Sequence, residues 1–431
     1  MEQRGLGIGI VWWPALDGLC REGEGLIDVI EAEPEAFWAP APDGSGFSSL
    51  LAEALLHLRQ PKLLHGVGAP VGGTCPPPDG HSVTLADDVA RLHPEFVSEH
   101  LSFTRFRPRL DDPPVPAGFM LPPLQSASGV SLAAANIRRH RAALGGLPVA
   151  VETPVSYLPP APGEWPDGTF VAAVAEAADC GILLDLHNVL TNARNGRQSV
   201  ASFCEALPKE RVWELHLSGG ESEAGFHLDA HAGLVEPELM EITAALVPLL
   251  PNLFAITFEI MPERVAQAGL SNIGRQIGKM RDLWNLRSAD YRPSGNAACT
   301  RPSTEPPVSH PVTWETALGC AINGLEKPTM DDAATAWWRS AEPALDLYRI
   351  LVGEGRASAV MSAAPRTTRL LLRQCSGPGT RRILADFWRQ STPGYTAADE
   401  ARALFRFLSA AHAALPGLSD AIALDVLDLT K

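Results

Sequence analysis

The sequence predicts an α/β fold: a TIM (β/α)8 barrel over residues 1–292, joined to a small all-α domain at the C-terminus. Two observations predict this fold. First, eight short apolar segments rich in leucine and β-branched residues occur before residue 262, and helical patterns separate several of them. Second, the pattern beyond residue 312 is helical. Strands that alternate with helices form a parallel sheet, and eight such repeats close into a barrel of ~250 residues.

The predicted elements of the barrel follow from these segments in chain order. Strands are expected at residues 6–11, 26–31, 62–67, 96–101, 149–153, 181–186, 212–217 and 254–260. The clearest helices between them are expected at 48–59, 132–144, 167–178 and 237–250. A long proline-rich segment at 106–123 follows the fourth strand. We expect it to be a loop over the barrel mouth, where such loops form lids or substrate walls.

The C-terminal domain is expected to begin after a linker. Residues 293–312 are rich in Pro, Ser and Thr and lack periodicity, which is typical of a segment between domains. Residues 313–431 are then expected to form the all-α domain. Within it, Thr396 and Asp399 have the spacing of a capping box that opens a helix.

Composition and charge exclude several functional classes. The formal net charge is −15, and all of it falls within residues 1–294, because 14 basic and 14 acidic residues balance over 295–431. Nucleic acid needs a basic surface and is not expected as a partner. No apolar stretch reaches the ~18 residues of a membrane span, and the N-terminus lacks a signal-peptide pattern. The seven cysteines include no CxxC pair, which favours reduced thiols and a cytoplasmic location over a zinc or iron–sulfur site.

Six side chains that can bind a metal lie at the downstream ends of predicted strands. They are His65, His100, Glu152, Asp185, His216 and Glu259. A parallel barrel brings its strand ends together at one mouth, so these six should converge there. Asp229 and His231, which follow the seventh strand, raise the number of ligands to eight. Eight nitrogen and oxygen ligands are too many for one ion and predict a multinuclear metal centre.

This prediction depends on the set, because a single histidine on a strand is more often structural. Charged side chains that point into one crevice are costly to desolvate unless they are paired or bind a metal. Imidazole and carboxylate ligands without thiolate suit iron, manganese or zinc, and a carboxylate such as Glu152 can bridge two ions. Asn188 is expected to be a further ligand or a supporting donor. Glu31 and Glu33 end the second strand and would contact substrate or support the ligands.

Asp229 and His231 are expected to control the place where the reaction occurs. One residue separates them, so on an extended segment their side chains would project to the same side and hold an ion at the edge of the mouth. A residue at the edge can control an open coordination position. Together with Glu152, this pair forms the predicted catalytic set.

The succession HGVG, SEHLSF, VETPVSYL, LLDLHNVLTNARNG, ELHLSG, DAH and FE resembles the multinuclear non-haem iron-dependent oxidative enzymes over roughly residues 5–285. This family includes the oxidase of methanobactin biosynthesis and relatives that modify cysteine-containing ribosomal peptides. The resemblance implies a TIM barrel that holds two or three irons, as Fe(II) and Fe(III), and uses O2 as co-substrate. It implies oxidation of a side chain, expected to be cysteine, in a ribosomally made precursor peptide. The ligand positions that it implies are His65, His100, Glu152, Asp185 or Asn188, His216, Asp229, His231 and Glu259.

The chain departs from the family pattern at two places. GIGIVWWPAL at the first strand lacks the histidine that many members have there, and VETPVSY replaces ENxSxY. Family members usually act with a separate small peptide-binding protein. The helical region at 313–431, with the segment FWRQSTPGYTAADEARALFRFL, resembles such partners. We therefore expect a small peptide-binding partner protein or its fused equivalent at 313–431.

Two other classes remain open from the residues alone. A divalent-metal hydrolase or sugar isomerase on a similar barrel would activate water or polarise a sugar. A non-catalytic peptide-binding scaffold would use the metal for structure only, which eight ligands at an open mouth disfavour.

Overall fold

The computed structural model describes residues 5–22, 25–41, 46–287, 310–326 and 332–429. These residues form two compact units. The first contains the described parts of Met1–Phe103 and Pro122–Pro311, and the second contains those of Thr104–Leu121 and Val312–Lys431.

The first unit is a closed barrel of eight parallel strands, which confirms the predicted TIM barrel. Around the barrel the strands follow one another in chain order, as a series of β/α repeats requires. They are β1 (Gly7–Val11), β2 (Val29–Ala32), β5 (Lys62–Gly66), β6 (Val97–His100), β9 (Val149–Glu152), β10 (Gly181–Asp185), β11 (Val212–Leu217) and β14 (Ala255–Phe258). Each of the eight overlaps the strand that the sequence predicts.

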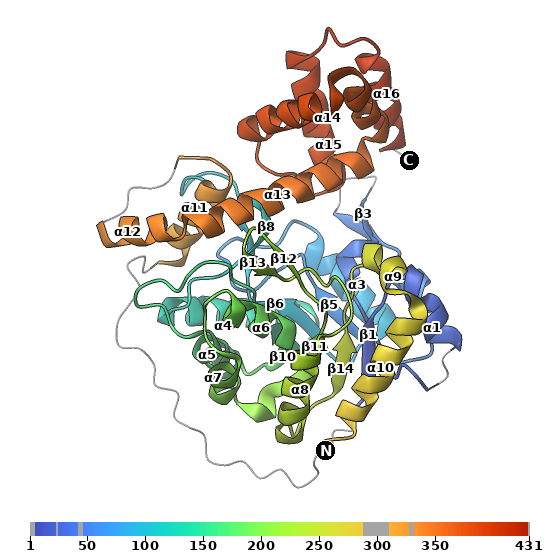
Figure 1. The fold of residues 1–431 in the computed structure, drawn as a ribbon, viewed down its shortest axis with the longest axis vertical. Helices are drawn as coiled ribbons and strands as arrows, with labels where there is room; N and C mark the ends of the chain where they lie inside the picture. Colours follow the sequence, from blue (N-terminus) through green and yellow to red (C-terminus); the bar gives the residue numbers. More distant parts are fainter. Residues whose placement is uncertain (1–4, 23–24, 42–45, 288–309, 327–331, 430–431) are drawn as a thin grey trace. The chain divides into compact units, whose positions relative to one another are not determined.

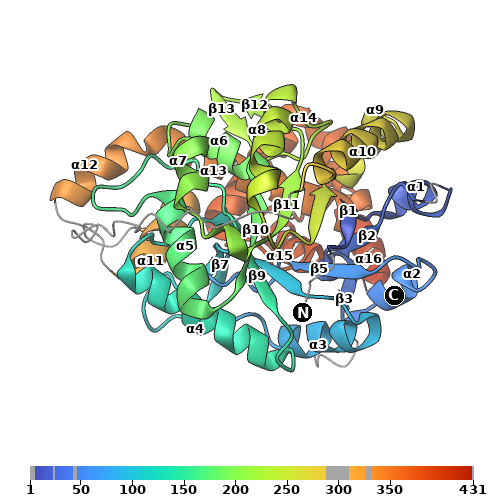
Figure 2. The same cartoon turned by 90° about the horizontal axis from the view of Figure 1, so that it is seen from below.

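Helices surround these strands on the outside of the barrel (Figures 1 and 2). The α-helices are α1 (Asp17–Glu22), α2 (Leu51–Leu55), α3 (His81–Leu92), α4 (Ala127–Ala143), α5 (Asp167–Ala178), α6 (Leu186–Arg194), α7 (Val200–Ala206), α8 (Pro237–Leu246), α9 (Pro262–Ala268) and α10 (Leu270–Trp284). Short 3-10 helices are η1 (Pro14–Leu16), η2 (Pro34–Phe37), η3 (Lys209–Arg211) and η4 (Val247–Leu249). Two small antiparallel pairs complete the unit: β3 (Trp38–Pro40) with β4 (Phe47–Ser49), and β12 (Glu221–Glu223) with β13 (Phe226–Leu228).

Two predicted helices begin at other residues than expected. The helix predicted at 48–59 is wrong over its first part, because residues 47–49 belong to β4, and α2 contains only five residues. The Ser49 hydroxyl accepts a hydrogen bond from the Leu51 amide (3.1 Å) at the start of α2. The helix predicted at 132–144 begins earlier, because Ser126 caps α4 by accepting a hydrogen bond from the Gly129 amide (3.1 Å).

The inner surface of the barrel changes from apolar to polar along the strands. Its lower level is a buried apolar cluster formed by Val29, Leu63, Phe96, Ala150, Leu183 and Ala255. Side chains alternate between the two faces of a strand, so the residue two positions further along also points inward. In all six strands that residue is polar: Glu31, His65, Ser98, Glu152, Asp185 and Thr257. The apolar floor therefore lies beneath a polar layer at the carboxyl ends.

The opposite faces of the same strands form the main core. Ile30, Leu64 and Val151 alternate with the inward residues and are fully buried in a cluster that includes Ile137 of α4 and Phe170 of α5. Burying a side chain of this kind favours folding by ~1.5–3 kcal/mol. This outer layer therefore supplies the stability that a polar interior lacks.

The second unit contains a two-stranded sheet as well as helices. Strands β7 (Phe103–Phe106) and β8 (Val115–Leu121) pair with each other. The helical region predicted at the C-terminus is confirmed and contains α11 (Pro311–Ile322), α12 (Asp332–Ser340), α13 (Glu342–Ala363), α14 (Pro365–Gln390), α15 (Ala397–Ala411) and α16 (Leu418–Asp428). Most of the predicted linker at 293–312 lies outside the described residues. None of the described helices has the length and apolar composition needed to cross a bilayer.

The segment predicted as a barrel loop at 106–123 instead belongs largely to the second unit. The Thr316 hydroxyl donates a hydrogen bond to the Arg107 carbonyl (2.9 Å), and the Asn323 side-chain amide donates one to the Ala117 carbonyl (3.1 Å). These partners lie 209 and 206 residues away along the chain. Local sequence patterns contain no information on such distant pairing, which explains the difference.

The predicted capping box is confirmed at the start of α15. The Thr396 hydroxyl accepts a hydrogen bond from the Asp399 amide, and the Asp399 carboxylate accepts one from the Thr396 amide (both 3.1 Å). The helix then buries Leu404 and Leu408 in a cluster with Phe387 of α14. The cap thus fixes the start of a helix whose apolar face holds the second unit together.

Gly9 of β1 tests how tightly the barrel interior is filled. A Cβ at this position would lie 2.6 Å from Thr257 Oγ1 and 2.9 Å from Val29 Cγ1, and both neighbours are β-branched and stiff. We expect Gly9→Ala to lower the free energy of unfolding by ~1–3 kcal/mol, as measured by urea denaturation.

Gly278→Ala in α10 is the matched control. A Cβ there meets open space, and alanine favours a helix over glycine by ~1 kcal/mol. Its stability should equal or exceed that of the wild type. If Gly9→Ala were as stable as Gly278→Ala, the interior would not be filled as described.

Candidate metal centre

The carboxyl ends of the barrel strands bring the six predicted strand-end ligands into one buried region. Each residue ends its strand, precedes the last residue or follows the strand directly: His65 in β5, His100 in β6, Glu152 in β9, Asp185 in β10, His216 in β11 and Glu259 after β14. Strand pairing places His100 beside Glu152 and Asp185 beside His216. The prediction that these side chains converge is thus consistent with the geometry.

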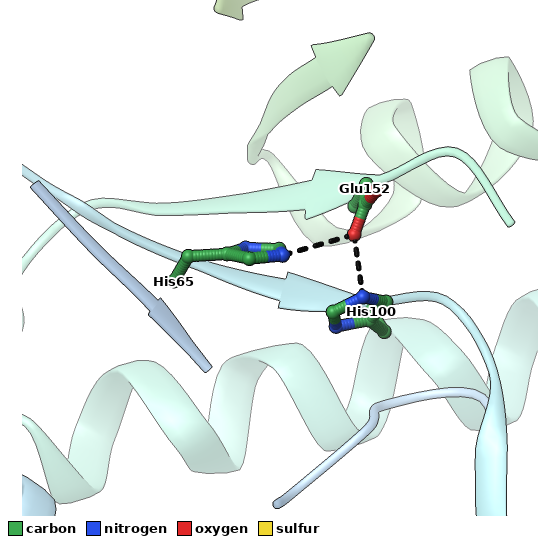
Figure 3. Close-up of side chains that lie close together, drawn as sticks. All are labelled: His65, His100 and Glu152. Atoms are coloured by element: carbon green, nitrogen blue, oxygen red, sulfur yellow. Dashed lines mark ion pairs between the residues drawn. The ribbon is translucent and has the colours of Figure 1, made fainter. Parts of the chain in front are cut away.

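The first group is formed by His65, His100 and Glu152 (Figure 3). Glu152 Oε2 lies 2.8 Å from His100 Nε2 and 3.2 Å from His65 Nε2. The other nitrogen of each ring has its own partner: His100 Nδ1 lies 2.9 Å from the Gly66 carbonyl, and His65 Nδ1 lies 2.8 Å from Ser98 Oγ. These outer contacts orient both rings with Nε2 toward the carboxylate, as in metal-binding histidines.

The second group lies around Glu259. Glu259 Oε1 is 3.2 Å from His231 Nδ1, and Glu259 Oε2 is 3.0 Å from His216 Nδ1. His231 Nε2 is in turn 2.7 Å from Asp229 Oδ1. The extended segment predicted for Asp229 and His231 is wrong, since His231 has a φ of 42° in the left-handed region. This turn, and not strand alternation, directs the His231 ring toward Asp229.

Asp185 and Asn188 contribute oxygen atoms between these two groups. Helix α6 begins directly after β10, and Asp185 Oδ1 accepts a hydrogen bond from the Asn188 amide (2.8 Å) as the helix N-cap. The Asn188 side-chain amide donates to Glu152 Oε1 (3.2 Å). Asp185 Oδ2 and Asn188 Oδ1 are buried and have no hydrogen-bond partner among the described residues. A cation would satisfy both oxygens.

The groups overlap and so form one connected centre. Four sets of three side chains have ligand atoms within 4.8 Å of one another: His65, His100 and Glu152; Glu152, Asp185 and His216; Asp185, His231 and Glu259; Glu31, Glu214 and His216. Glu152, Asp185 and His216 each occur in two of these sets. No cysteine belongs to any set within the described ranges, and the donors are imidazole and carboxylate groups that suit iron, manganese or zinc.

Residues 6–264, more than half of the chain, match the model of a protein family. That family is described as the RiPP precursor modification enzymes MbnB/TglH/ChrH. RiPPs are ribosomally synthesised and post-translationally modified peptides. The chain belongs to this family. The match covers every strand of the barrel and the whole centre.

Relatives of the chain are UPF0276 proteins of bacteria. One from Anaeromyxobacter sp. (strain Fw109-5) is 31% identical over 51% of this chain and 74% of its own length. One from Streptomyces avermitilis is 28% identical over 76% of this chain and 65% of its own length. Among solved structures, a D-psicose 3-epimerase from Clostridium cellulolyticum H10 has a TM-score of 0.41 at 10% identity, covering 66% of this chain and 100% of the epimerase.

Within this family member, contact between imidazole and carboxylate shifts the pKa of both partners in the first group. Burial alone would lower the pKa of His100, but Glu152 and Glu99 together outweigh burial and raise that pKa well above its usual value. Burial alone would raise the pKa of Glu152, but His100 and His65 hold it well below its usual value. In the absence of a metal, the two histidines therefore stabilise the buried Glu152 carboxylate.

In the second group, too, neighbouring charges oppose the effect of burial on the pKa values. Burial opposes protonation of His216 and His231, yet the neighbouring carboxylates raise the pKa of both rings well above the usual value. Burial would raise the pKa of Glu259, but His231 and His216 lower it to about 2. Asp185 differs, because burial and then Asp229 raise its pKa well above the usual value. A bound cation would replace the protons that now neutralise this group.

The sequence reasoning missed part of the centre. Glu214 lies two residues before His216 on β11 and is fully buried. Glu31, which we expected to contact substrate or to support a ligand, lies with its Oε2 2.7 Å from His216 Nε2. Glu33 is half-buried, and burial together with Glu259 raises its pKa to about 7. The alternation of Glu214 with His216 in VWELH is a signal that would have identified Glu214.

The raised pKa values of His216 and His231 predict that protons compete with a metal. Both rings keep their protons to a higher pH than a free histidine does, so a divalent ion must displace them. We expect the affinity of the metal-free chain for Zn(II) to rise from about pH 6 to about pH 8, with net release of protons. Calorimetric titration in two buffers of different ionisation enthalpy measures the number released.

Two variants calibrate this experiment. Glu152→Gln removes a carboxylate that belongs to two of the sets and should weaken binding most. His57→Ala removes a histidine paired with Asp17 outside these sets and should leave binding unchanged. Affinity independent of pH would contradict the assignment of these imidazoles as ligands.

Proposed function

We propose that this member of the family is an iron-dependent oxidase that uses O2 to modify a cysteine side chain of a ribosomally made precursor peptide. Its membership in a family of RiPP precursor modification enzymes supports a peptide substrate. The observation that carries the metal-dependent part is the overlap of buried three-residue sets at the carboxyl ends of the strands.

The proposed iron ligands are seven members of the overlapping sets, without Glu31 and Glu214, together with the neighbouring Asn188 and Asp229. They are His65, His100, Glu152, Asp185, Asn188, His216, Asp229, His231 and Glu259. Glu152 contacts two histidines through one oxygen and belongs to two sets, which supports its role as a bridge between two ions. The number of ligands supports two or three irons per chain, and their nitrogen and oxygen donors suit both Fe(II) and Fe(III). Bound iron would supply the redox capacity for the reaction with O2.

The residues of the chain would organise this chemistry in two levels. The fully buried side chains, among them Asp185 and His216, would hold the ions in an interior closed to solvent. Asp229 and His231 are about 20% and 16% exposed, so they lie where substrate and O2 can enter. With Glu152, these two residues form the proposed catalytic set.

A divalent-metal hydrolase or sugar isomerase is the alternative that the ligand chemistry leaves open, since manganese and zinc accept the same donors. A peptide-modifying family favours the oxidase. The two functions differ in one observable, because only the oxidase consumes O2 in step with product.

Asp229→Asn and His231→Ala test the proposed function. Both side chains lie at the accessible edge of the centre, so each variant should keep the folded barrel and much of its iron. Each should lose at least about 100-fold in product formation and O2 uptake, the scale expected when a ligand of a reacting metal is removed. The measurements are iron per chain, O2 consumption and the mass of a cysteine-bearing precursor peptide, to be sought in the neighbouring reading frames.

His227→Ala is the matched control. His227 of β13 contacts Ser222 of the neighbouring strand β12 and belongs to none of the metal sets. It should retain full activity. Normal product formation by Asp229→Asn or His231→Ala would remove that residue from the catalytic set, and turnover without O2 would exclude the oxidase.

We also propose that the second unit recruits the precursor peptide, as a fused equivalent of a peptide-binding partner. The unit contains a cavity of about 560 Å³ between residues 108–110 and α11, a volume in the range of ligand-binding pockets. Leu110 lines this cavity and is about 74% exposed. An exposed leucine beside a cavity supports binding of an apolar side chain.

Leu110→Asp tests this recruitment. The charge should weaken binding of the precursor peptide at least about tenfold, because an apolar contact at such a site is worth about 1–3 kcal/mol, while the iron content stays unchanged. Fluorescence anisotropy with a labelled peptide measures the affinity. Leu372→Asp is the control, since Leu372 of α14 is also exposed and does not line the cavity. Equal affinities of both variants and wild type would place recruitment elsewhere.

A further inference from the structure

Two carboxylates lie close to Nε2 of the His216 imidazole. Glu31 Oε2 is 2.7 Å from His216 Nε2, and Glu214 Oε1 is 3.9 Å from the same nitrogen. All three side chains are fully buried. The function proposed above assigns no role to either carboxylate. An isolated buried charge is strongly destabilising, so the presence of both carboxylates requires an explanation.

The barrel topology explains how Glu31 reaches His216. Strands β2 and β11 are separated in the barrel by β1 and β14, so Glu31 must extend across the interior. β1 contributes Gly9, which pairs with Thr257 and places no side chain between β2 and β14. Thr257 of β14 donates a hydrogen bond to Glu214 Oε1 (2.5 Å). The strands between Glu31 and His216 therefore add only the Thr257 side chain at this level, and that side chain holds the second carboxylate in place.

The two nitrogens of His216 face different surroundings. Nδ1 is 3.0 Å from Glu259, which belongs to a metal set with Asp185 and His231. Nε2 is directed at Glu31. An imidazole that binds a metal through one nitrogen usually donates its other N–H to a carboxylate, which fixes the ring and increases its strength as a ligand.

We propose that Glu31 is a positioning residue that accepts the Nε2–H of His216 and thereby directs Nδ1 to the metal. Glu214, held by Thr257, keeps Glu31 in place and does not itself bind the metal. This inference rests on the proposed metal centre. It adds to that centre a carboxylate–histidine pair that spans the barrel from β2 to β11.

The two carboxylates differ in their partners. Glu31 Oε2 lies within hydrogen-bond distance of His216 Nε2, whereas Glu214 Oε1, at 3.9 Å from that nitrogen, does not. Glu214 Oε1 accepts its hydrogen bond from the Thr257 hydroxyl. Glutamine should therefore replace Glu214 more readily than Glu31.

The test uses the full chain loaded anaerobically with Fe(II). Glu31→Gln should bind the same number of ions as the wild type but hold the ion at His216 about 10–100-fold more weakly, the usual effect of losing an outer carboxylate. Competition with a chelator measures the affinity. Glu214→Gln should stay within about threefold of the wild type, since it leaves the contact at Nε2 intact. The visible spectrum of the Co(II)-loaded chain should change in Glu31→Gln only, because a residue with a merely structural role does not alter the ligand field.

His216→Ala provides the thermodynamic cycle. If Glu31 acts through His216, Glu31→Gln should have no further effect on affinity in the His216→Ala background. A persisting effect would overturn the inference, as would unchanged affinity and spectrum in Glu31→Gln itself. Loss of one whole ion in both Glu31→Gln and Glu214→Gln would show that these carboxylates are ligands. If the wild type binds no Fe(II), the proposed metal centre fails first and is distinguished from a failure at Glu31 alone.

Discussion

The exclusion of water from the carboxyl-end half of the barrel is the constraint on which the first unit depends. Glu31, Asp185, Glu214 and His216 have no solvent exposure, and an unpaired charge in such a place would cost several kcal/mol. Each of these groups must therefore be matched by a proton, an opposite charge or a metal ion. The raised pKa of His216 and the lowered pKa of Glu259 are two consequences of this one requirement.

The same constraint explains the layering of the barrel. The inward positions two residues earlier on the strands include Val29, Leu63 and Leu183. Their side chains form a floor that has no hydrogen-bonding side-chain groups. Above the floor, the buried polar side chains contact one another and nearby backbone groups. The interior thus has few arrangements that satisfy all its donors and acceptors, and such a site is organised before any ligand arrives.

Much of this architecture was predictable because it depends on local patterns of apolar and polar residues in the sequence. A strand such as 212–217 appears as an apolar run, and His216 at its end marks the mouth by position alone. The contact between Glu31 and His216 was not predictable, since it joins residues 185 positions apart and exists only once the barrel closes. The left-handed turn at His231 also escaped prediction, because a non-glycine residue with positive φ has no reliable sequence signature.

The membership of residues 104–121 in the second unit has a consequence for biosynthesis. The Arg107 carbonyl is translated 209 residues before Thr316, which completes its hydrogen bond. The barrel strands end at Phe258, so the barrel can close on the ribosome while this segment still waits for α11 to emerge. During that interval Phe106, fully buried in the finished protein, has no cover from the helices. A nascent chain that exposes such an apolar segment is a substrate for chaperones that shield apolar surface. A chain truncated after the barrel would expose the segment permanently.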